Sequence, residues 1–329
     1  MMKNRLAVFL VAAVLLLALP LVAQQFGNSW VRIVDMALLY VLLALGLNIV
    51  VGYAGLLDLG YVAFYAVGAY FFGLLASPHL TDTFAWMKAM FPNGLHTPWW
   101  LVIPIGAGVA GIFGVLLGAP TLKLRGDYLA IVTLGFGEII RVFLNNLDAP
   151  VNITNGPKGV QQIDSLRVFG LNLGRTTELW GFELPSVTLY YYFLLALVVF
   201  SVVLCYRLER SRIGRAWMAI REDEVAAKAM GINTRNMKLL AFGMGATFGG
   251  VSGVLFASFQ GFISPESFVL HESIMVVAMV VLGGIGHIPG VIVGALLLAA
   301  LPEVLRHLAG DLQRMTDGRL DAAILRQLL

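Results

Sequence analysis

The sequence predicts an all-α polytopic membrane protein with about eight transmembrane helices, or up to about ten if glycine-rich breaks divide some of them. The mean hydropathy of the 329-residue chain is +0.85, and 59% of its residues are hydrophobic. Only 12% are charged, which is about half the share expected of a soluble domain. Several apolar runs reach the roughly 20 residues that a helix needs to cross a bilayer, and they are continuous rather than alternating. Residues 1–329 are therefore expected to form a single transmembrane domain.

The sequence lacks the motifs of several catalytic classes. It contains no GxxxxGKS/T motif, so the chain cannot hold ATP in a P-loop of its own. No histidine–cysteine pairing indicates a metal site, and no nucleophile stands beside a base. The formal net charge of +3 does not indicate nucleic-acid binding, because the basic residues lie in loops beside the apolar runs. We expect a non-catalytic protein without a cofactor or metal, in which the single cysteine, Cys205, has a packing role.

The first two apolar runs contain the first candidate break. Residues 6–23 follow Lys3 and Arg5 and predict an uncleaved helix with a cytoplasmic N-terminus; a signal peptide is the alternative. Residues 36–51 predict a second helix, which Gly52-Tyr53-Ala54-Gly55 interrupts before a further run at residues 61–76. Such an interruption either lines a cavity or forms a tight turn between two ordinary helices.

Three charged residues lie within or beside apolar runs, where ionised groups are costly and often functional. Asp58 follows the first break, and it either lines a cavity or is exposed near a turn. Glu138 and Arg141 are three residues apart on one predicted helix, so their side chains can pair. The pair is either structural or part of a transport path or gate, and we keep all three residues as candidates for such a role.

The remaining helices follow from further apolar runs and the loops between them. We expect residues 77–98 and 147–186 to be external loops and residues 121–127 a short cytoplasmic turn, after which Asp127 caps a helix. Glycine pairs divide the long run at residues 271–301. The four arginines after Pro302 place the C-terminal tail on the cytoplasmic side. Four further apolar runs predict helices at residues 99–118, 128–146, 187–206 and 239–262.

Two glycine-rich segments resemble each other within the chain. Residues 106–116 read GAGVAGIFGVL and residues 245–255 read GATFGGVSGVL, with identical residues at six of eleven positions. The expected topology runs the first inward and the second outward, which would make them inverted repeats, an arrangement common in transporters. The alternative is coincidence between two glycine-rich helix faces.

One segment is densely charged although apolar runs flank it. Residues 207–238 hold eight Lys/Arg and four Asp/Glu, which predicts a cytoplasmic loop. Within it, residues 222–231 predict a short helix, because acids occupy its first turn and Gly231 suits its C-terminal end. Val225/Ala229 and Ala226/Met230 are i,i+4 pairs that would form a small apolar ridge. The helix either docks in the groove of a soluble partner or rests on lipid headgroups.

The same loop resembles a known motif. Ala226-Ala227, followed after three residues by Gly231, resembles the EAA loop of ABC importer permeases, in which this loop forms the coupling helix that docks on the ATPase subunits. The acid stands one position early, at Glu224, and the downstream Ile-x-Leu-Pro is absent. The resemblance assigns ATPase coupling to Glu224, Ala226, Ala227 and Gly231.

Further segments resemble branched-chain amino acid permeases of the M type, over about residues 30–305. They are GLLDLG at 55–60 with GAY at 68–70, TLGFGEIIR at 133–141, TNGPKG at 154–159, and GGIG at 283–286 with Gly290 and Gly294. Importers of urea and short amides share much of this pattern. The resemblance implies a multi-pass subunit of a bacterial inner-membrane importer that carries leucine, isoleucine and valine.

The resemblance also implies partners, namely a homologous second permease subunit, two ABC ATPase subunits, a periplasmic substrate-binding protein and the lipid bilayer. Three other interpretations remain at this point. The same machinery could carry urea, amides or another small polar solute. A secondary transporter could use Asp58 and Glu138 for proton coupling, although the sequence shows no relay of acids between them. The chain could also be a membrane scaffold that transports nothing.

Overall fold

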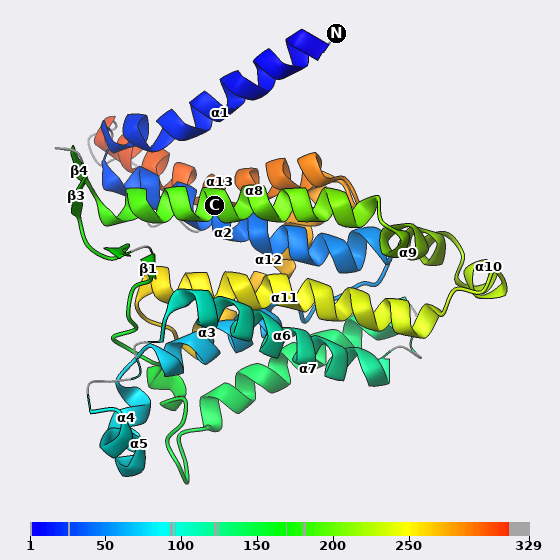
Figure 1. Cartoon of the computed structure of the whole chain (residues 1–329), viewed down its shortest axis with the longest axis horizontal. Coiled ribbons are helices and arrows are strands. Elements are labelled where there is room, and N and C mark those ends of the chain that lie inside the picture. The colour runs from blue at the N-terminus through cyan, green and yellow to red at the C-terminus, as the bar shows by residue number, and fades with distance from the viewer. Residues whose placement is uncertain are drawn as a thin grey trace.

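The computed structural model describes residues 2–25, 27–92, 95, 97–121, 124, 126–168, 170–179 and 182–315, and helices dominate this part of the chain (Figure 1). In chain order the elements are α1 (Met2–Gln25), α2 (Asn28–Asn48), the π-helix η1 (Ile49–Tyr53), α3 (Val62–Leu75), α4 (His79–Thr83), α5 (Ala85–Met90), α6 (Trp99–Thr121), α7 (Asp127–Asn146), the 3₁₀ helix η2 (Gly156–Lys158), β1 (Arg167–Val168), β2 (Leu171–Asn172), β3 (Thr177–Leu179), β4 (Phe182–Leu184), α8 (Ser186–Glu209), α9 (Arg212–Glu222), α10 (Glu224–Ala229), α11 (Thr234–Gln260), the 3₁₀ helix η3 (Pro265–Phe268), α12 (Leu270–Gly283) and α13 (Ile288–Met315).

The helices confirm the all-α polytopic class. Within the described residues, five helical segments are long and apolar enough to cross a membrane: Asn28–Tyr53, Trp99–Thr121, Ser186–Glu209, Thr234–Gln260 and Pro265–Gly283. Three shorter apolar segments accompany them: Val14–Gln25, Val62–Leu75 and Ile288–Pro302. Their total agrees with the predicted number of about eight, although α7, which corresponds to the predicted helix 128–146, is not among them and the run at 271–301 corresponds to two of them.

Helix α11 lies at the centre, packed between α2, α3 and α6. Its glycines allow this, because close approach of backbones is the main way helices gain packing energy in lipid. A Cβ atom at Gly250 would lie 2.5 Å from the Cβ of Ala110 on α6, and one at Gly68 on α3 would lie 2.2 Å from the carbonyl oxygen of Gly250. The two similar segments, 106–116 and 245–255, therefore lie against each other in antiparallel helices.

The two ends of the bundle differ in character (Figure 1). At one end, which we call the α10 end, lie α9, α10 and the connections at residues 54–61 and 284–287. At the other, which we call the hairpin end, lie α4, α5 and the two-stranded hairpins β1–β2 and β3–β4. Strand pairing is antiparallel, with Val168 opposite Leu171 and Glu178 opposite Glu183.

The course of α13 separates the C-terminal residues from α10. Gly286, just before α13, bonds to Asn48 near the α10 end, and α13 then runs along α2 towards the hairpin end (Figure 1). Arg306 and Arg314 belong to α13 and so lie at the end opposite α10, whereas the sequence placed them on the same side; Arg319 and Arg326 lie outside the described residues.

Two helices are broken near the α10 end. Helix α2 passes into η1, and residues 54–61 then leave the helical conformation before α3 begins. The second break separates α12 from α13, where Gly284 and Gly286 adopt positive φ angles of 96° and 87°. Both breaks fall at glycines that the sequence singled out. At the first, the segment Asn28–Tyr53 is long enough to cross a membrane by itself, and the shorter helix α3 follows after the non-helical residues 54–61.

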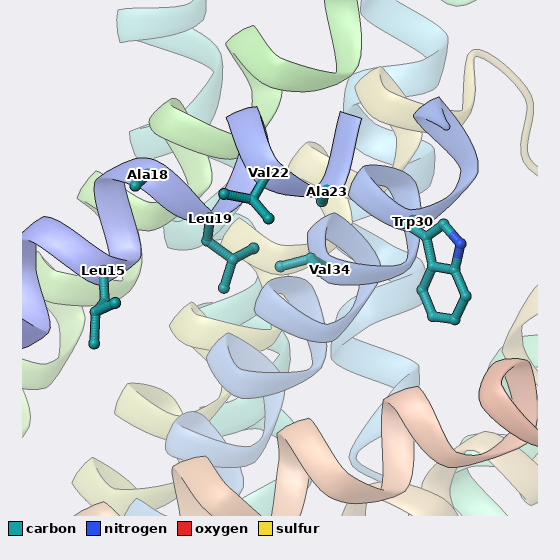
Figure 2. A pocket seen from close by; sticks show the side chains of 7 residues that line it. All are labelled: Leu15, Ala18, Leu19, Val22, Ala23, Trp30 and Val34. Carbon is teal, nitrogen blue, oxygen red and sulfur yellow. The ribbon is translucent and has the colours of Figure 1, made fainter. Parts of the chain in front are cut away.

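Helix α1 leans away from the bundle (Figure 1). In its described part, residues 14–25, most side chains are exposed, with Val14 at 63% and Leu15 at 65%. An apolar groove of about 410 Å³ separates α1 from α2 (Figure 2). The lining residues are all hydrophobic: Leu15, Ala18, Leu19, Val22, Ala23, Trp30 and Val34. Such a surface suits lipid chains and offers nothing to bind a polar solute.

Candidate functional site

Helix α10 begins at a side-chain cap. The Oδ1 atom of Asp223 accepts hydrogen bonds from the backbone N–H groups of Val225, at 2.8 Å, and Ala226, at 3.0 Å. Asp223 therefore satisfies two of the amide groups that a helix N-terminus leaves free. The observed helix α10 is thus shorter than the predicted helix at residues 222–231, because Glu222 belongs to the preceding helix α9.

The same helix ends at Gly231, as the sequence suggested. Gly231 adopts a φ of 85°, which a residue with a Cβ atom disfavours. Its N–H donates to the carbonyl of Lys228 at 3.1 Å, and the N–H of Ile232 donates to the carbonyl of Ala227 at 3.1 Å. These two bonds are the Schellman arrangement, which closes a helix and turns the chain away from it.

The apolar ridge of α10 faces away from the protein. Val225 is 67% exposed and Met230 is 83% exposed, and Ala226 and Ala229 are exposed as well. Ala227, in contrast, is 4% exposed and packs towards the body of the protein. One face of α10 therefore anchors the helix, while the opposite face presents a low apolar surface that the described residues leave uncovered.

Three contacts, which we call the tethers, join the loop at 207–238 to the bundle. The Glu224 Oε1 atom lies 2.7 Å from the Nζ atom of Lys238, whose side chain is only 7% exposed. The indole N–H of Trp217, a fully buried residue, donates to the backbone carbonyl of Met237 at 2.7 Å. The Arg221 Nη1 atom donates to the backbone carbonyl of Gly52 at 2.5 Å.

The tethers revise the interpretation of the charges in this loop. The sequence explained them mainly as determinants of orientation, but Glu224 and Lys238 form an ion pair between α10 and the first turns of α11. Sequence reasoning did not identify Trp217, Arg221 or Lys238. A tryptophan inside a strongly charged loop was the available signal, because such a side chain needs an apolar place to pack.

Asp58 lies at the break between η1 and α3. It is fully buried, so the expected exposure near a turn is wrong. Its Oδ1 atom accepts from the N–H of Gly60 at 2.9 Å, while Oδ2 has no hydrogen-bond partner among the described residues. The neighbouring N–H of Leu59 donates to Thr133 Oγ1 on α7 at 3.0 Å. Asp58 therefore shapes the break locally, and its role in a path or gate remains a prediction.

Glu138 and Arg141 pair as their spacing suggested. The Arg141 Nε atom lies 2.9 Å from Glu138 Oε2, and Arg141 Nη1 lies 3.7 Å from Glu266 Oε1 on η3. Arg141 thus connects α7 with the connection before α12. Glu138 and Leu59 line the same small crevice between α3, α7 and α12, which brings this pair near the first break. A gating role for the pair also remains a prediction.

One buried acid escaped the sequence analysis. Asp35 on α2 is fully buried, and neither of its carboxylate oxygens has a hydrogen-bond partner among the described residues. Arg32 stands one turn earlier, so the sequence around Asp35 resembles an exposed ion pair and does not indicate a buried acid. Within the described residues, no three His, Cys, Asp or Glu side chains gather where they could hold a metal ion.

Breaks within membrane helices, a buried glycine-packed centre and a tethered helix on a charged loop define the class of membrane transport permeases. A family model described as "Branched-chain amino acid transport system / permease component" matches residues 29–318. The chain therefore belongs to the family of branched-chain amino acid transport permeases, which confirms the resemblance of its motifs.

Individual relatives agree with this assignment. The chain is 44% identical over 311 residues to the high-affinity branched-chain amino acid transport system permease protein LivM of Escherichia coli, covering 91% of this chain and 68% of that protein. Against LivM of Salmonella typhimurium the identity is 44%, over 84% of this chain and 63% of the relative. The permease protein LivH of the same organism is 28% identical, over 84% of this chain and 83% of its own length. The chain thus spans about two thirds of the LivM proteins. The comparison with solved structures gave no match.

Proposed function

We propose that this chain is the M-type permease subunit of an ATP-driven importer that moves leucine, isoleucine and valine across the bacterial inner membrane. The α10 end faces the cytoplasm and the hairpin end faces the periplasm. The family, the names of the relatives and the density of positive charge around α9 and α10 support this orientation and this substrate class.

The observation that carries the proposal is the geometry of α10. The helix is capped at both ends and tethered through Glu224, while Val225 and Met230 expose an apolar ridge to water. A short rigid helix with a low apolar ridge fits a groove on a soluble protein. That protein is an ABC ATPase, one of two in the complex, because the chain carries no P-loop of its own.

The proposed complex contains two further partners. A homologous permease subunit pairs with this chain, which agrees with its similarity to both LivM and LivH proteins. A periplasmic binding protein delivers the amino acid at the hairpin end, where residues 147–186 form the longest polar stretch of the sequence. ATP-driven movement of the ATPases would displace α10 and, through the tethers, switch the bundle between outward and inward access.

A paired substitution tests this function. Gly231→Asp forces a side chain into a positive φ and places a charge beside the ridge, so we expect ATP-dependent leucine uptake to be abolished while the protein remains in the membrane. Deletion of residues 223–231 should have the same effect. Gly170→Asp is the matched control, because Gly170 has a φ of 84° but lies on the hairpin at the opposite end; it should leave binding of the ATPases unchanged.

Two results would contradict the proposal. Uptake that persists after Gly231→Asp and after the deletion would show that α10 does not couple transport to ATP. Uptake that follows the proton gradient without ATP would favour a secondary transporter. Competition of labelled leucine uptake by unlabelled isoleucine, valine and urea identifies the substrate class, and displacement by urea alone would replace amino acids with urea.

A further inference from the structure

We propose that Arg221 transmits the movement of the coupling loop to both helix breaks, so that the contacts of Asn48, Gly52, Arg221 and Gly286 act as one switch beneath the transport path. We call these four residues the Arg221 junction. The inference rests on the proposed function, because it assigns the internal step between ATPase-driven movement of α10 and reorganisation of the membrane helices.

Arg221 links α9 directly to the first break. It stands in the last turn of α9, three residues before α10 begins, and its Nη1 atom donates to the carbonyl of Gly52 at 2.5 Å. Gly52 belongs to the π-helix η1, after which the backbone leaves the helical conformation. Carbonyl groups at such an end need other partners, and a guanidinium group supplies a strong one. Displacing α10 would therefore act on the end of η1 through Arg221, which lies three residues before the first turn of α10.

A second hydrogen bond extends the junction to the other break. Asn48, which is 1% exposed, accepts through Oδ1 from the backbone N–H of Gly286 at 2.9 Å. Gly286 lies between α12 and α13, far from Asn48 in the sequence. One buried amide side chain thus holds the two broken segments side by side.

The junction is packed too closely to admit other side chains. A Cβ atom at Gly52 would lie 2.1 Å from Asn48 Oδ1 and 2.8 Å from the backbone nitrogen of Gly286. A Cβ atom at Gly286 would lie 3.0 Å from Arg221 Nη1, and one at Gly55 would lie 2.9 Å from Arg221 Cγ. Arg221 therefore contacts both breaks at once, and neither break can move without changing its contacts.

The Arg221 junction suits a set of contacts that opens and closes better than a fixed structural link. The segments beside the junction, residues 54–61 and 284–287, contain glycines at positive φ and lack the regular hydrogen bonds of a helix. They can change shape through a few backbone torsions, whereas the intact helices around them cannot. Arg221 is itself partly exposed, so its contact with Gly52 can open without burying an unpaired charge.

The test measures coupling, not only uptake. The complete complex, with its partner permease, ATPases and binding protein, is reconstituted in vesicles with Arg221→Ala, Arg221→Lys or Asn48→Leu. We expect Arg221→Ala to lower leucine uptake about tenfold while ATP hydrolysis continues, so that the ATP hydrolysed per leucine rises about tenfold. Arg221→Lys should be intermediate, because it keeps one charged donor. Asn48→Leu should act in the same direction. Arg212→Ala, an exposed arginine at the start of α9, should leave the ratio unchanged.

Hydrogen exchange gives a second readout that does not depend on the amount of folded protein. In the unaltered complex, trapping with a non-hydrolysable ATP analogue should change exchange in α10 and at residues 49–56 and 284–290. In Arg221→Ala the change in α10 should remain and the change at both breaks should be lost. Unchanged ATP per leucine, or exchange that still changes at both breaks, overturns this inference and leaves the proposed function standing. Failure of the unaltered complex to import with ATP overturns the proposed function itself.

Discussion

Helix α1 and the loop at 207–238 are attached to the bundle in opposite ways. Helix α1 is mostly apolar, exposes most of the side chains described for residues 14–25 and leaves a groove against α2. The loop is the most charged part of the chain, yet it contains a fully buried tryptophan, a buried lysine and an arginine bonded to a backbone carbonyl. From hydropathy alone, we would have expected α1 to be attached to the bundle more tightly than the loop.

The difference follows from the surroundings of the two segments, which are hydrocarbon for α1 and water for the loop. A helix in hydrocarbon satisfies its own backbone and loses little by facing lipid, so few protein contacts are needed to keep it in place. A loop in water gains nothing from remaining ordered unless directional bonds hold it. The tethers through Trp217, Arg221 and Glu224 supply such bonds, which makes the charged loop the better candidate for carrying force.

The largest effect on stability is expected from substitution of the buried Trp217 in the charged loop. Trp217→Ala should lower the free energy of unfolding by about 3–5 kcal/mol, because it empties a buried site and removes the bond to Met237. Trp217→Phe keeps most of the packing and should cost about 1 kcal/mol. Thermal unfolding of the protein in nanodiscs measures both. Equal losses for the two variants would show that the hydrogen bond alone holds α9.

The next largest effect on stability is expected from loss of the ion pair between Glu224 and Lys238. Glu224→Gln leaves the buried Lys238 without its ion-pair partner and should cost about 1–3 kcal/mol. The double variant Glu224→Gln, Lys238→Met should recover part of this loss, since it leaves no buried charge unpaired. Glu222→Gln, at an exposed acid on the end of α9, is the control and should change stability by less than about 0.5 kcal/mol. If the single and double variants are equally unstable, the pair does not tether α10.

The smallest effect is expected on α1. Leu15→Ala removes a large apolar side chain, but one that is 65% exposed, so the change should stay within about 0.5 kcal/mol. Leu42→Ala on α2, where the side chain is 1% exposed, should cost about 2–5 kcal/mol in the same assay. A loss of similar size at Leu15 would mean that α1 is held as firmly as the core helices.

Local features of this chain could be predicted from its sequence. The glycines at 52–55 and 283–290 marked the two breaks, because only glycine accepts the positive φ angles found there. The C-terminal end of α10 followed from Gly231, although its first residue is Glu224 and not Glu222, and the ion pair of Glu138 with Arg141 followed from helical spacing. In each case the information lies within a few residues, where propensity and periodicity operate.

Contacts between distant segments could not be predicted in this way. Nothing in a single sequence indicates that Arg221 meets Gly52 or that Asn48 meets Gly286, because these contacts depend on how whole helices pack. The position of Arg306 and Arg314 at the end opposite α10 was missed for a related reason, since it depends on the path of α13. The burial of Asp58 depends on α7, which supplies Thr133 as a partner for the adjacent backbone.

The position of α11 has a mechanical consequence. Two tethers, from Trp217 and Glu224, end on Met237 and Lys238 in its first turns. The helix has 27 residues and is therefore about 40 Å long. A rigid tilt of about 5° about its glycine-packed middle would move its two ends in opposite directions by roughly 2 Å. Its far end bonds through Gln260 to Arg32 of α2, so such a tilt would link the α10 end to the hairpin end without any change in the helix itself.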